Sequence, residues 1–133
     1  SASLVGSEMC IRDSTWTMHR AGRWQELMGP SWGQYGTHVV NGIFVHSVAC
    51  GQANSYNLPV GEYLRLGNPA SHGCIRACVA DAKWVWDNCN GSKIHIFDGT
   101  YTSNEALKGP LGRKALTPLR GSKNFDPTDP ACK

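Results

Sequence analysis

The pattern of apolar and polar residues predicts strands in the first half of the chain. The segment THVVNGIFVHSVA (residues 37–49) gives the strongest strand signal, because Val, Ile and Phe are concentrated on both of its faces. A strand that is apolar on both faces is expected to lie centrally, and His46 and Ser47 stand at its end. Upstream, residues 15–36 combine aromatic, glycine and polar residues without a helical period, which predicts short strands and a long loop.

A long connection and one helix follow. Residues 51–73 are rich in Gly, Asn, Ser and Pro, and a loop of this length inside a compact domain is typically functional. The segment CVADAKWVWDNC (residues 78–89) has apolar residues at helical spacing, with Asp81 in the first turn. Asn90 and Gly91 end this predicted helix.

The remaining segments predict one more strand and a tail. Residues 92–99, SKIHIFDG, alternate with Ile94 and Ile96 on one face, which predicts a strand. Residues 101–133 are irregular and rich in proline, and we expect them to form a C-terminal surface tail. Together the elements predict a mainly β fold of the mixed α+β class, with one prominent helix.

Composition limits the classes of protein and partner. The chain has 133 residues, enough for one domain with a single core, and hydrophobic residues make up 41% of it. No apolar run approaches the roughly 20 residues that span a bilayer, so we expect no membrane insertion by this segment. The net charge is +3 and the basic residues are scattered, which gives no indication of a nucleic-acid groove.

Six cysteines permit disulfides or a metal site, but their spacing does not choose between these roles. No CxxC pair is present, and disulfide connectivity cannot be deduced from the sequence. His46-x3-Cys50 and Cys74-x3-Cys78 are spacings compatible with zinc ligation, which leaves a zinc site open. Packing and disulfide formation are the other roles considered for Cys50, Cys78 and Cys89.

The segment ASHGCIRAC (residues 70–78) concentrates the groups of a cysteine acyl-transfer site. Cys74 is a nucleophile only as a thiolate, and an ordinary thiol has a pKa near 8.5. His72 and His46 are candidate bases, and the helix predicted directly after Cys74 would favour an anion at its N-terminus. The amides of Gly73 and Cys74 could face a developing oxyanion. From the residues alone, a buried inert cysteine stays open as the alternative.

A family resemblance bears on this choice. HS after GIFV, the loop, SHGCIR and VADAKWVWDN together resemble the L,D-transpeptidase (YkuD) catalytic domain over about residues 15–98. The resemblance implies a β-sandwich with one prominent helix after the catalytic cysteine loop, in a domain spanning residues 15–100. Residues 1–14, SASLVGSEMCIRDS, resemble a translated sequencing adapter, so we expect a non-native start and a domain that lacks the family's first strands. The segment FDPTDPA near the end is similar to tails in some members.

The resemblance implies a role for each residue of the motif. Cys74 would be the nucleophile, and His46 the general base whose imidazole is oriented by the Ser47 carbonyl. His72 would line the site and help hold the acyl group. Gly73 would permit the turn and let the Cys74 amide contribute to the oxyanion hole.

Substrate contacts are implied less directly. Ser71 would support the loop, and Arg76 would either pair with a substrate carboxylate or anchor the loop. For the aromatic lid residue of the family, Tyr35 and Trp32 are the candidates.

The activity implied by the resemblance is acyl transfer between the stem peptides of peptidoglycan, one acting as donor and one as acceptor. D-Ala would be released and a 3→3 cross-link formed, without metal or organic cofactor, in an enzyme of cell-wall biogenesis and cell shape that carbapenems acylate. Hydrolysis of stems by an L,D-carboxypeptidase, or wall binding without turnover, are the alternatives. The location would be extracytoplasmic, with a signal or anchor missing from this chain.

Overall fold

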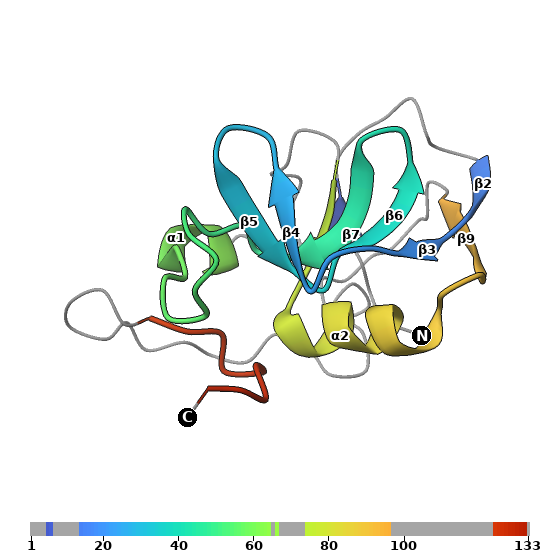
Figure 1. Ribbon diagram of the computed structural model, residues 1–133. Helices are drawn as coiled ribbons and strands as arrows, with labels where there is room; N and C mark the ends of the chain where they lie inside the picture. The colour runs from blue at the N-terminus through green and yellow to red at the C-terminus, as the bar shows by residue number, and fades with distance from the viewer. Residues whose placement is uncertain (1–4, 7–13, 65, 67–73, 97–123, 133) are drawn as a thin grey trace, which may run out of the picture.

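The fold is mainly β within the part of the chain that the computed structural model describes, residues 5–6, 14–64, 66, 74–96 and 124–132 (Figure 1). The central element is a five-stranded sheet. Its strands lie in the order β1 (Val5–Gly6), β8 (Ile75–Ala77), β7 (Ile43–Ser47), β6 (Thr37–Val40), β3 (His19–Arg20). The predicted mainly β, mixed α+β class is therefore confirmed.

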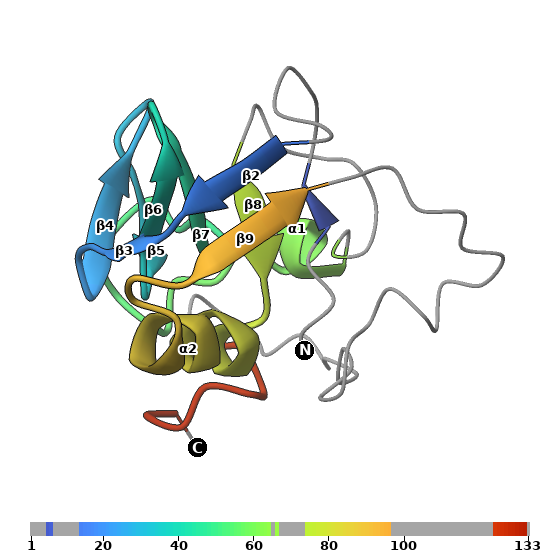
Figure 2. The ribbon, with the colours of Figure 1, turned by 90° about the vertical axis from the view of Figure 1, so that its right-hand side faces the viewer.

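Two small sheets and two helices complete the described structure. β2 (Ser14–Thr17) and β9 (Lys93–Ile96) pair antiparallel and lie side by side in Figure 2. β4 (Trp24–Leu27) and β5 (Ser31–Gln34) form an antiparallel hairpin. The helices are α1 (Val60–Leu64) and α2 (Val79–Asn88). The short strands predicted for residues 15–36 and the helix predicted for residues 78–89 are thus confirmed. The long loop predicted within residues 15–36 is wrong, because the hairpin of β4 and β5 takes its place, and α1 was not predicted.

The apolar segment 37–49 is a hairpin, so the prediction of one continuous strand was wrong. β6 and β7 pair antiparallel across a turn at Asn41 and Gly42. Asn41 has a φ of 51°, in the left-handed region that asparagine tolerates better than most residues. β7 nevertheless lies between β6 and β8 in the middle of the sheet, as predicted, and it ends at Ser47.

A short strand separates Cys74 from the helix, which corrects a second expectation. β8 begins at the residue after Cys74 and runs parallel to β7, and α2 begins only at Val79 with Cys78 as its N-cap. The helix N-terminus is therefore not adjacent to the Cys74 thiol. Activation of Cys74 by this helix dipole, as predicted, is wrong because the dipole acts only within the first turn.

Helix α2 covers one face of the sheet. Val45 of β7 and Ile75 of β8 are buried in one apolar cluster with Val85 of α2. Ile94 and Ile96 pack against the same cluster, which confirms that they share a face of β9. This apolar layer fixes the register of β7 against β8, because a slip by one residue would turn these side chains away from the helix.

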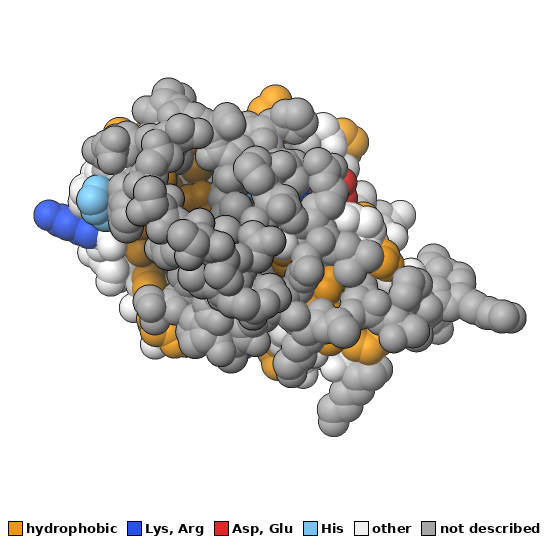
Figure 3. All heavy atoms as spheres, turned by 180° about the vertical axis from the view of Figure 1, so that it is seen from behind, with side chains coloured by type: hydrophobic (Ala, Val, Ile, Leu, Met, Phe, Trp, Pro, Cys, Tyr) orange, Lys and Arg blue, Asp and Glu red, His pale blue; other side chains and the backbone are white. Residues whose placement is uncertain are grey.

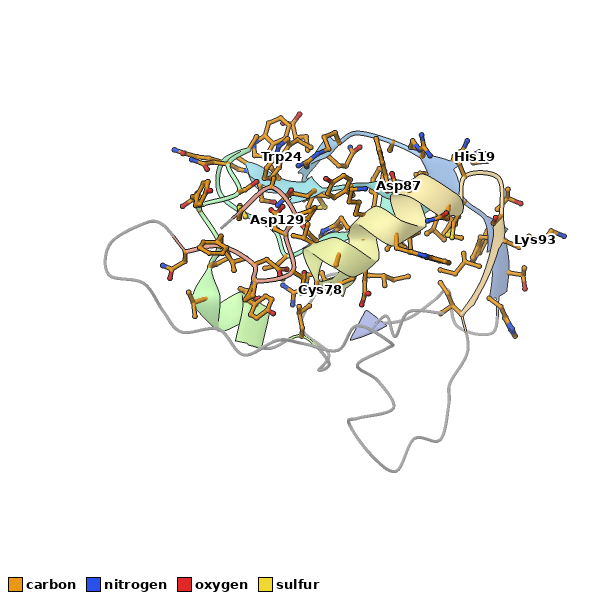
Figure 4. All side chains as sticks on the ribbon, turned by 90° about the horizontal axis from the view of Figure 1, so that it is seen from below. His19, Trp24, Cys78, Asp87, Lys93 and Asp129 are labelled. Atoms are coloured by element: carbon orange, nitrogen blue, oxygen red, sulfur yellow. The ribbon has the colours of Figure 1, made fainter. Side chains whose placement is uncertain are left out.

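The segment 124–132 packs onto the molecule, so the expected surface tail is wrong for these residues. Asp126 and Asp129 are only 2% and 3% exposed. Asp126 Oδ2 accepts a hydrogen bond from the Val79 amide at 2.8 Å, and Thr128 Oγ1 accepts one from the Ala80 amide at 3.1 Å. The segment thus caps α2, at the end marked by Cys78 in Figure 4.

Two further expectations concern the ends and the surface of the chain. The non-native start expected for residues 1–14 stays a prediction, and within these residues Val5–Gly6 form strand β1, paired with β8. Among the described residues, no helix is both long and apolar enough to cross a membrane. Few charged side chains are visible among the described residues on the face seen in Figure 3, and charged residues make up 17% of the chain.

Candidate active site

The two central candidates lie on neighbouring stretches of the sheet. In the parallel pair of β7 and β8, Val45 is level with Ile75 and His46 is level with Arg76. Because side chains alternate along a strand, His46 and Arg76 face away from the buried Val45 and Ile75, and Cys74 directly precedes β8. Neighbouring strands are about 4.8 Å apart and a residue rises about 3.3 Å, so the α-carbons of His46 and Cys74 are separated by roughly 8 Å.

The His46 imidazole is held in one orientation. It is 2% exposed, and its Nδ1 is hydrogen bonded to the Ser47 carbonyl oxygen. Since a carbonyl only accepts, Nδ1 carries the proton and Nε2 is the basic nitrogen. The Ser47 carbonyl thus has the orienting contact that the family resemblance implies.

Burial keeps this imidazole neutral. Desolvation is the main cause that lowers the His46 pKa from 6.5 to about 4, and the positive charge of Arg76 lowers it further. The hydrogen bond to Ser47 acts in the opposite direction. At neutral pH His46 is therefore unprotonated, although its lowered pKa makes it a weaker base than an ordinary imidazole.

The imidazole packs against a glycine that the sequence analysis did not single out. A β-carbon added at Gly33 of β5 would lie 2.7 Å from Nδ1 and 2.9 Å from Cγ of His46. Contacts this short cannot exist between real atoms, so the imidazole occupies the space that any other side chain would need. A glycine between Trp32 and Gln34 carries no local signal of this contact, because it depends on how β5 meets β7.

Cys74 presents a thiol at the start of β8. The side chain is partly buried, and Sγ lies 3.6 Å from the Gly42 carbonyl oxygen of the β6–β7 turn. Burial raises the pKa of the thiol, whereas a hydrogen bond with the Phe44 backbone and the charge of Arg76 lower it. A group that lowers a thiol pKa must stabilise the thiolate, so the Phe44 contact is a donated N–H.

Arg76 is the cation next to both groups. Its Nη1 lies 2.8 Å from Oε2 of Glu62, and the two side chains are 11% and 39% exposed. Glu62 belongs to α1, so this ion pair joins the helix to the catalytic face. The sequence identified Arg76 but not Glu62, because a five-residue helix inside a loop gives too few turns for a periodic signal.

Tyr35 and Trp32 lie where the β4–β5 hairpin meets α2 and the chain after β7. Tyr35 is 6% exposed and packs edge-on against Trp86, with ring centroids 5.4 Å apart. The Arg23 guanidinium lies 4.0 Å from the centre of the same ring. This burial gives no support to a lid role for Tyr35, which stays a prediction. Trp32 pairs through its backbone with Cys50.

Three further residues of the motif, Ser71, His72 and Gly73, lie outside the described residues. Their contributions to the loop, the acyl site and the turn stay predictions.

The other cysteines within the described residues are free thiols. Cys50 and Cys78 are buried, and burial raises the pKa of each to about 11, helped for Cys50 by the nearby Asp126 and Asp129. Within the part of the chain that the structure describes, no three His, Cys, Asp or Glu side chains are grouped so that they could hold a metal ion.

A comparison with protein families identifies this arrangement. The model of the YkuD L,D-transpeptidase catalytic domain matches residues 9–100 of the chain, which is more than half of its length. The chain belongs to the L,D-transpeptidase catalytic domain family. The matched residues include both His46, in β7, and Cys74, directly before β8.

Individual relatives are matched over shorter stretches. YciB of Bacillus subtilis (strain 168), a protein named as an L,D-transpeptidase, is 59% identical over 27 residues, which are 20% of this chain and 14% of that protein. A fused Zn-dependent amidase/peptidase/peptidoglycan-binding domain-containing protein from Clostridium acetobutylicum ATCC 824 aligns over 62% of this chain and 33% of that chain. Its identity is 23% and its TM-score 0.36, too low for a structural conclusion.

Proposed function

We propose that this chain is a peptidoglycan L,D-transpeptidase in which Cys74 is the nucleophile and His46 the general base. The proposal is supported by one observation above all: His46 lies in β7 and Cys74 directly precedes the adjacent parallel strand β8, and His46 keeps Nε2 as its basic nitrogen. Family membership implies a peptidoglycan substrate and an extracytoplasmic location.

The first step forms a thioester. As Cys74 Sγ attacks the carbonyl carbon of the third residue of a donor stem, its proton passes to Nε2 of His46. The tetrahedral intermediate carries its negative charge on the former carbonyl oxygen, and the amides of Gly73 and Cys74 stabilise it. The C–N bond to D-Ala then breaks, and D-Ala leaves as an amine after taking the proton from His46.

The second step releases the product. The side-chain amine of the third residue of an acceptor stem attacks the thioester and gives a proton to His46. The C–S bond breaks, the sulfur recovers its proton from His46, and a 3→3 amide cross-link is formed. If water replaces the amine, the product is a trimmed stem with a free carboxylate.

The electrostatics favour proton transfer during the attack over a preformed ion pair. The pKa of His46 is lowered to about 4 and the pKa of Cys74 is raised, so both groups are neutral at pH 7. Arg76 reduces the rise for Cys74, because its positive charge stabilises the developing thiolate. Burial of the pair thus makes His46 a base with no competing protonation at neutral pH.

Turnover of a purified tetrapeptide stem tests the proposal. We expect free D-Ala together with a cross-linked dimer, both detected by liquid chromatography and mass spectrometry. Cys74→Ala should abolish both products, and Cys89→Ala should retain them, because Cys89 lies at the far end of α2.

The products separate the proposal from its alternatives. Release of D-Ala with tripeptide and without dimer would replace the transferase by a carboxypeptidase. Binding of stems without release of D-Ala would leave a wall-binding module and overturn the enzymatic assignment.

A further inference from the structure

We propose that Gly33 and Gln34 of β5, anchored by Asp129 of the C-terminal segment, are positioning residues for the catalytic base His46. The proposal rests on the role of His46 proposed above. It joins two parts of the chain that are far apart in sequence, residues 124–132 and the end of β7.

Gly33 sets the depth of the imidazole. A β-carbon at this position would lie 2.7 Å from Nδ1, 2.9 Å from Cγ and 3.0 Å from Cβ of His46. Nδ1 is the same atom that is hydrogen bonded to the Ser47 carbonyl oxygen. A larger residue at Gly33 would therefore move the ring and break the contact that fixes its tautomer.

Gln34 is hydrogen bonded to Ser47, the residue of β7 that follows His46. Its backbone N–H donates a hydrogen bond of 2.8 Å to Ser47 Oγ, and both residues are nearly fully buried. Because side chains alternate along β5, Gly33 meets His46 while the side chain of Gln34 points to the opposite side. Two consecutive residues of β5 thus contact the two consecutive residues His46 and Ser47.

The C-terminal segment fixes β5 from that opposite side. Gln34 Nε2 donates to Asp129 Oδ2 at 3.0 Å, between residues 95 positions apart in the chain. Asp129 is 3% exposed, and its Oδ1 accepts from the Ala131 amide at 2.9 Å. Figure 4 shows Asp129 beside the end of α2 marked by Cys78, where Asp126 caps the helix.

β5 is also hydrogen bonded to Cys50, in the segment that follows β7. The N–H groups of Trp32 and Cys50 each donate to the carbonyl oxygen of the other residue at 2.8 Å. Cys50 follows β7 closely in the chain, so β5 is tied to the segment after the base as well as to the C-terminal segment. The strand that packs against His46 is therefore held by two other segments of the chain.

Gly33→Ala tests the contact with the base, and Gly51→Ala is the matched control. A β-carbon at Gly51 would meet only Asn57 Nδ2, at an ordinary 3.8 Å. In a histidine NMR titration, the wild-type pKa of His46 should be about 4. Gly33→Ala should raise it toward 6.5 as the ring moves toward solvent, and Gly51→Ala should leave it at the wild-type value.

The rate of Cys74 acylation by a carbapenem is the second readout. We expect Gly33→Ala to lower the rate constant by at least about tenfold while the adduct still forms on Cys74, because the base is displaced and the nucleophile is retained. An unchanged His46 titration in folded Gly33→Ala would overturn the inference. If the carbapenem does not modify the wild-type protein, the proposed function is contradicted instead. The two failures can be distinguished because the His46 titration does not require an active enzyme.

Asp129 tests the distant anchor without changing β5. Asp129→Ala removes the acceptor of Gln34 Nε2, and we expect a several-fold lower acylation rate and a shifted His46 titration. Asp129→Asn keeps one oxygen that can accept from the Ala131 amide, and its NH2 group can donate to Gln34 Oε1, which has no partner among the described residues. The link between the two side chains then survives with donor and acceptor exchanged. Rescue by Asp129→Asn is the expected result, and equal behaviour of Asp129→Ala and wild type in both readouts would exclude the coupling.

Discussion

The two faces of β7 and β8 differ in what they bury. On the face covered by α2, Val45 and Ile75 are 0% and 6% exposed and lie in an apolar cluster. On the opposite face, the same strands carry His46 and Arg76, and Cys74 directly precedes β8. One parallel register therefore serves both purposes: the apolar contacts fix it, and the proposed catalytic groups take their relative position from it.

The comparison also separates the energetic costs of the two faces. Burying Val45 stabilises the fold, whereas burying a neutral imidazole or an arginine costs free energy unless the group has a polar partner. The partner of His46 is the Ser47 carbonyl oxygen, and the partner of Arg76 is Glu62. We expect this polar face to carry the reactive groups and to make the fold less stable at low pH, where the buried His46 becomes protonated on unfolding.

The largest expected effect is on activity, and it should occur in a variant of the polar face but not in a variant of the apolar face. His46→Gln removes the base, and we expect the acylation rate to fall about 10²- to 10⁴-fold with the fold retained. Val45→Ala deletes buried methyl groups on the opposite face, and we expect a loss of about 2 kcal/mol in unfolding free energy with nearly full activity. Acylation kinetics and urea unfolding of both variants check this. Similar losses of activity in the two variants would show that the faces are not separable.

The next effect is on stability at acid pH. The folded pKa of His46, about 4, lies below its ordinary 6.5, so the unfolded state binds the proton first as pH falls. This stabilising contribution is complete above pH 6.5 and is lost as pH falls through about 4. The lowering corresponds to about 3 kcal/mol.

Urea unfolding at several pH values measures this loss. We expect wild type to lose more free energy of unfolding between pH 7 and pH 4 than His46→Gln does. The difference between the two isolates His46 from other buried groups such as Asp81, whose pKa is raised by burial and which acts in the opposite direction. Parallel pH curves would contradict a buried neutral imidazole.

The smallest effect concerns the charge next to the thiol. Arg76→Met should raise the pKa of Cys74 and slow its alkylation by iodoacetamide at neutral pH several-fold, because Arg76 lowers this pKa. Arg76→Lys keeps the charge and serves as the control. Glu62→Gln removes the partner of Arg76, and faster alkylation is expected. If Arg76→Met and Glu62→Gln changed the rate in the same direction, the electrostatic account would fail.

Local patterns predicted much of this site. The apolar run of residues 37–49 placed His46 and Ser47 at the end of a central strand, and helical spacing identified α2. The alternation of Ile94 and Ile96 identified a face of β9. Each of these features depends on residues within about ten positions of one another, which is the range of a periodic signal.

The remaining features depend on contacts that no local pattern records. β8 has three residues and is too short for an alternation to be recognised, so the sequence predicted that the helix follows Cys74 directly. Gly33 matters only because β5 meets His46, and Asp129 only because it meets Gln34, 95 positions away. The proline-rich composition around Asp126 indicated a tail because composition does not report hydrogen bonds to a helix end.

The most direct test of the central claim is the mass of the intact protein after incubation with a carbapenem, followed by peptide mapping. The account predicts a single adduct on Cys74, which Cys74→Ala removes and Cys89→Ala retains. An unmodified wild-type protein, or an adduct that survives Cys74→Ala on another cysteine, would contradict it.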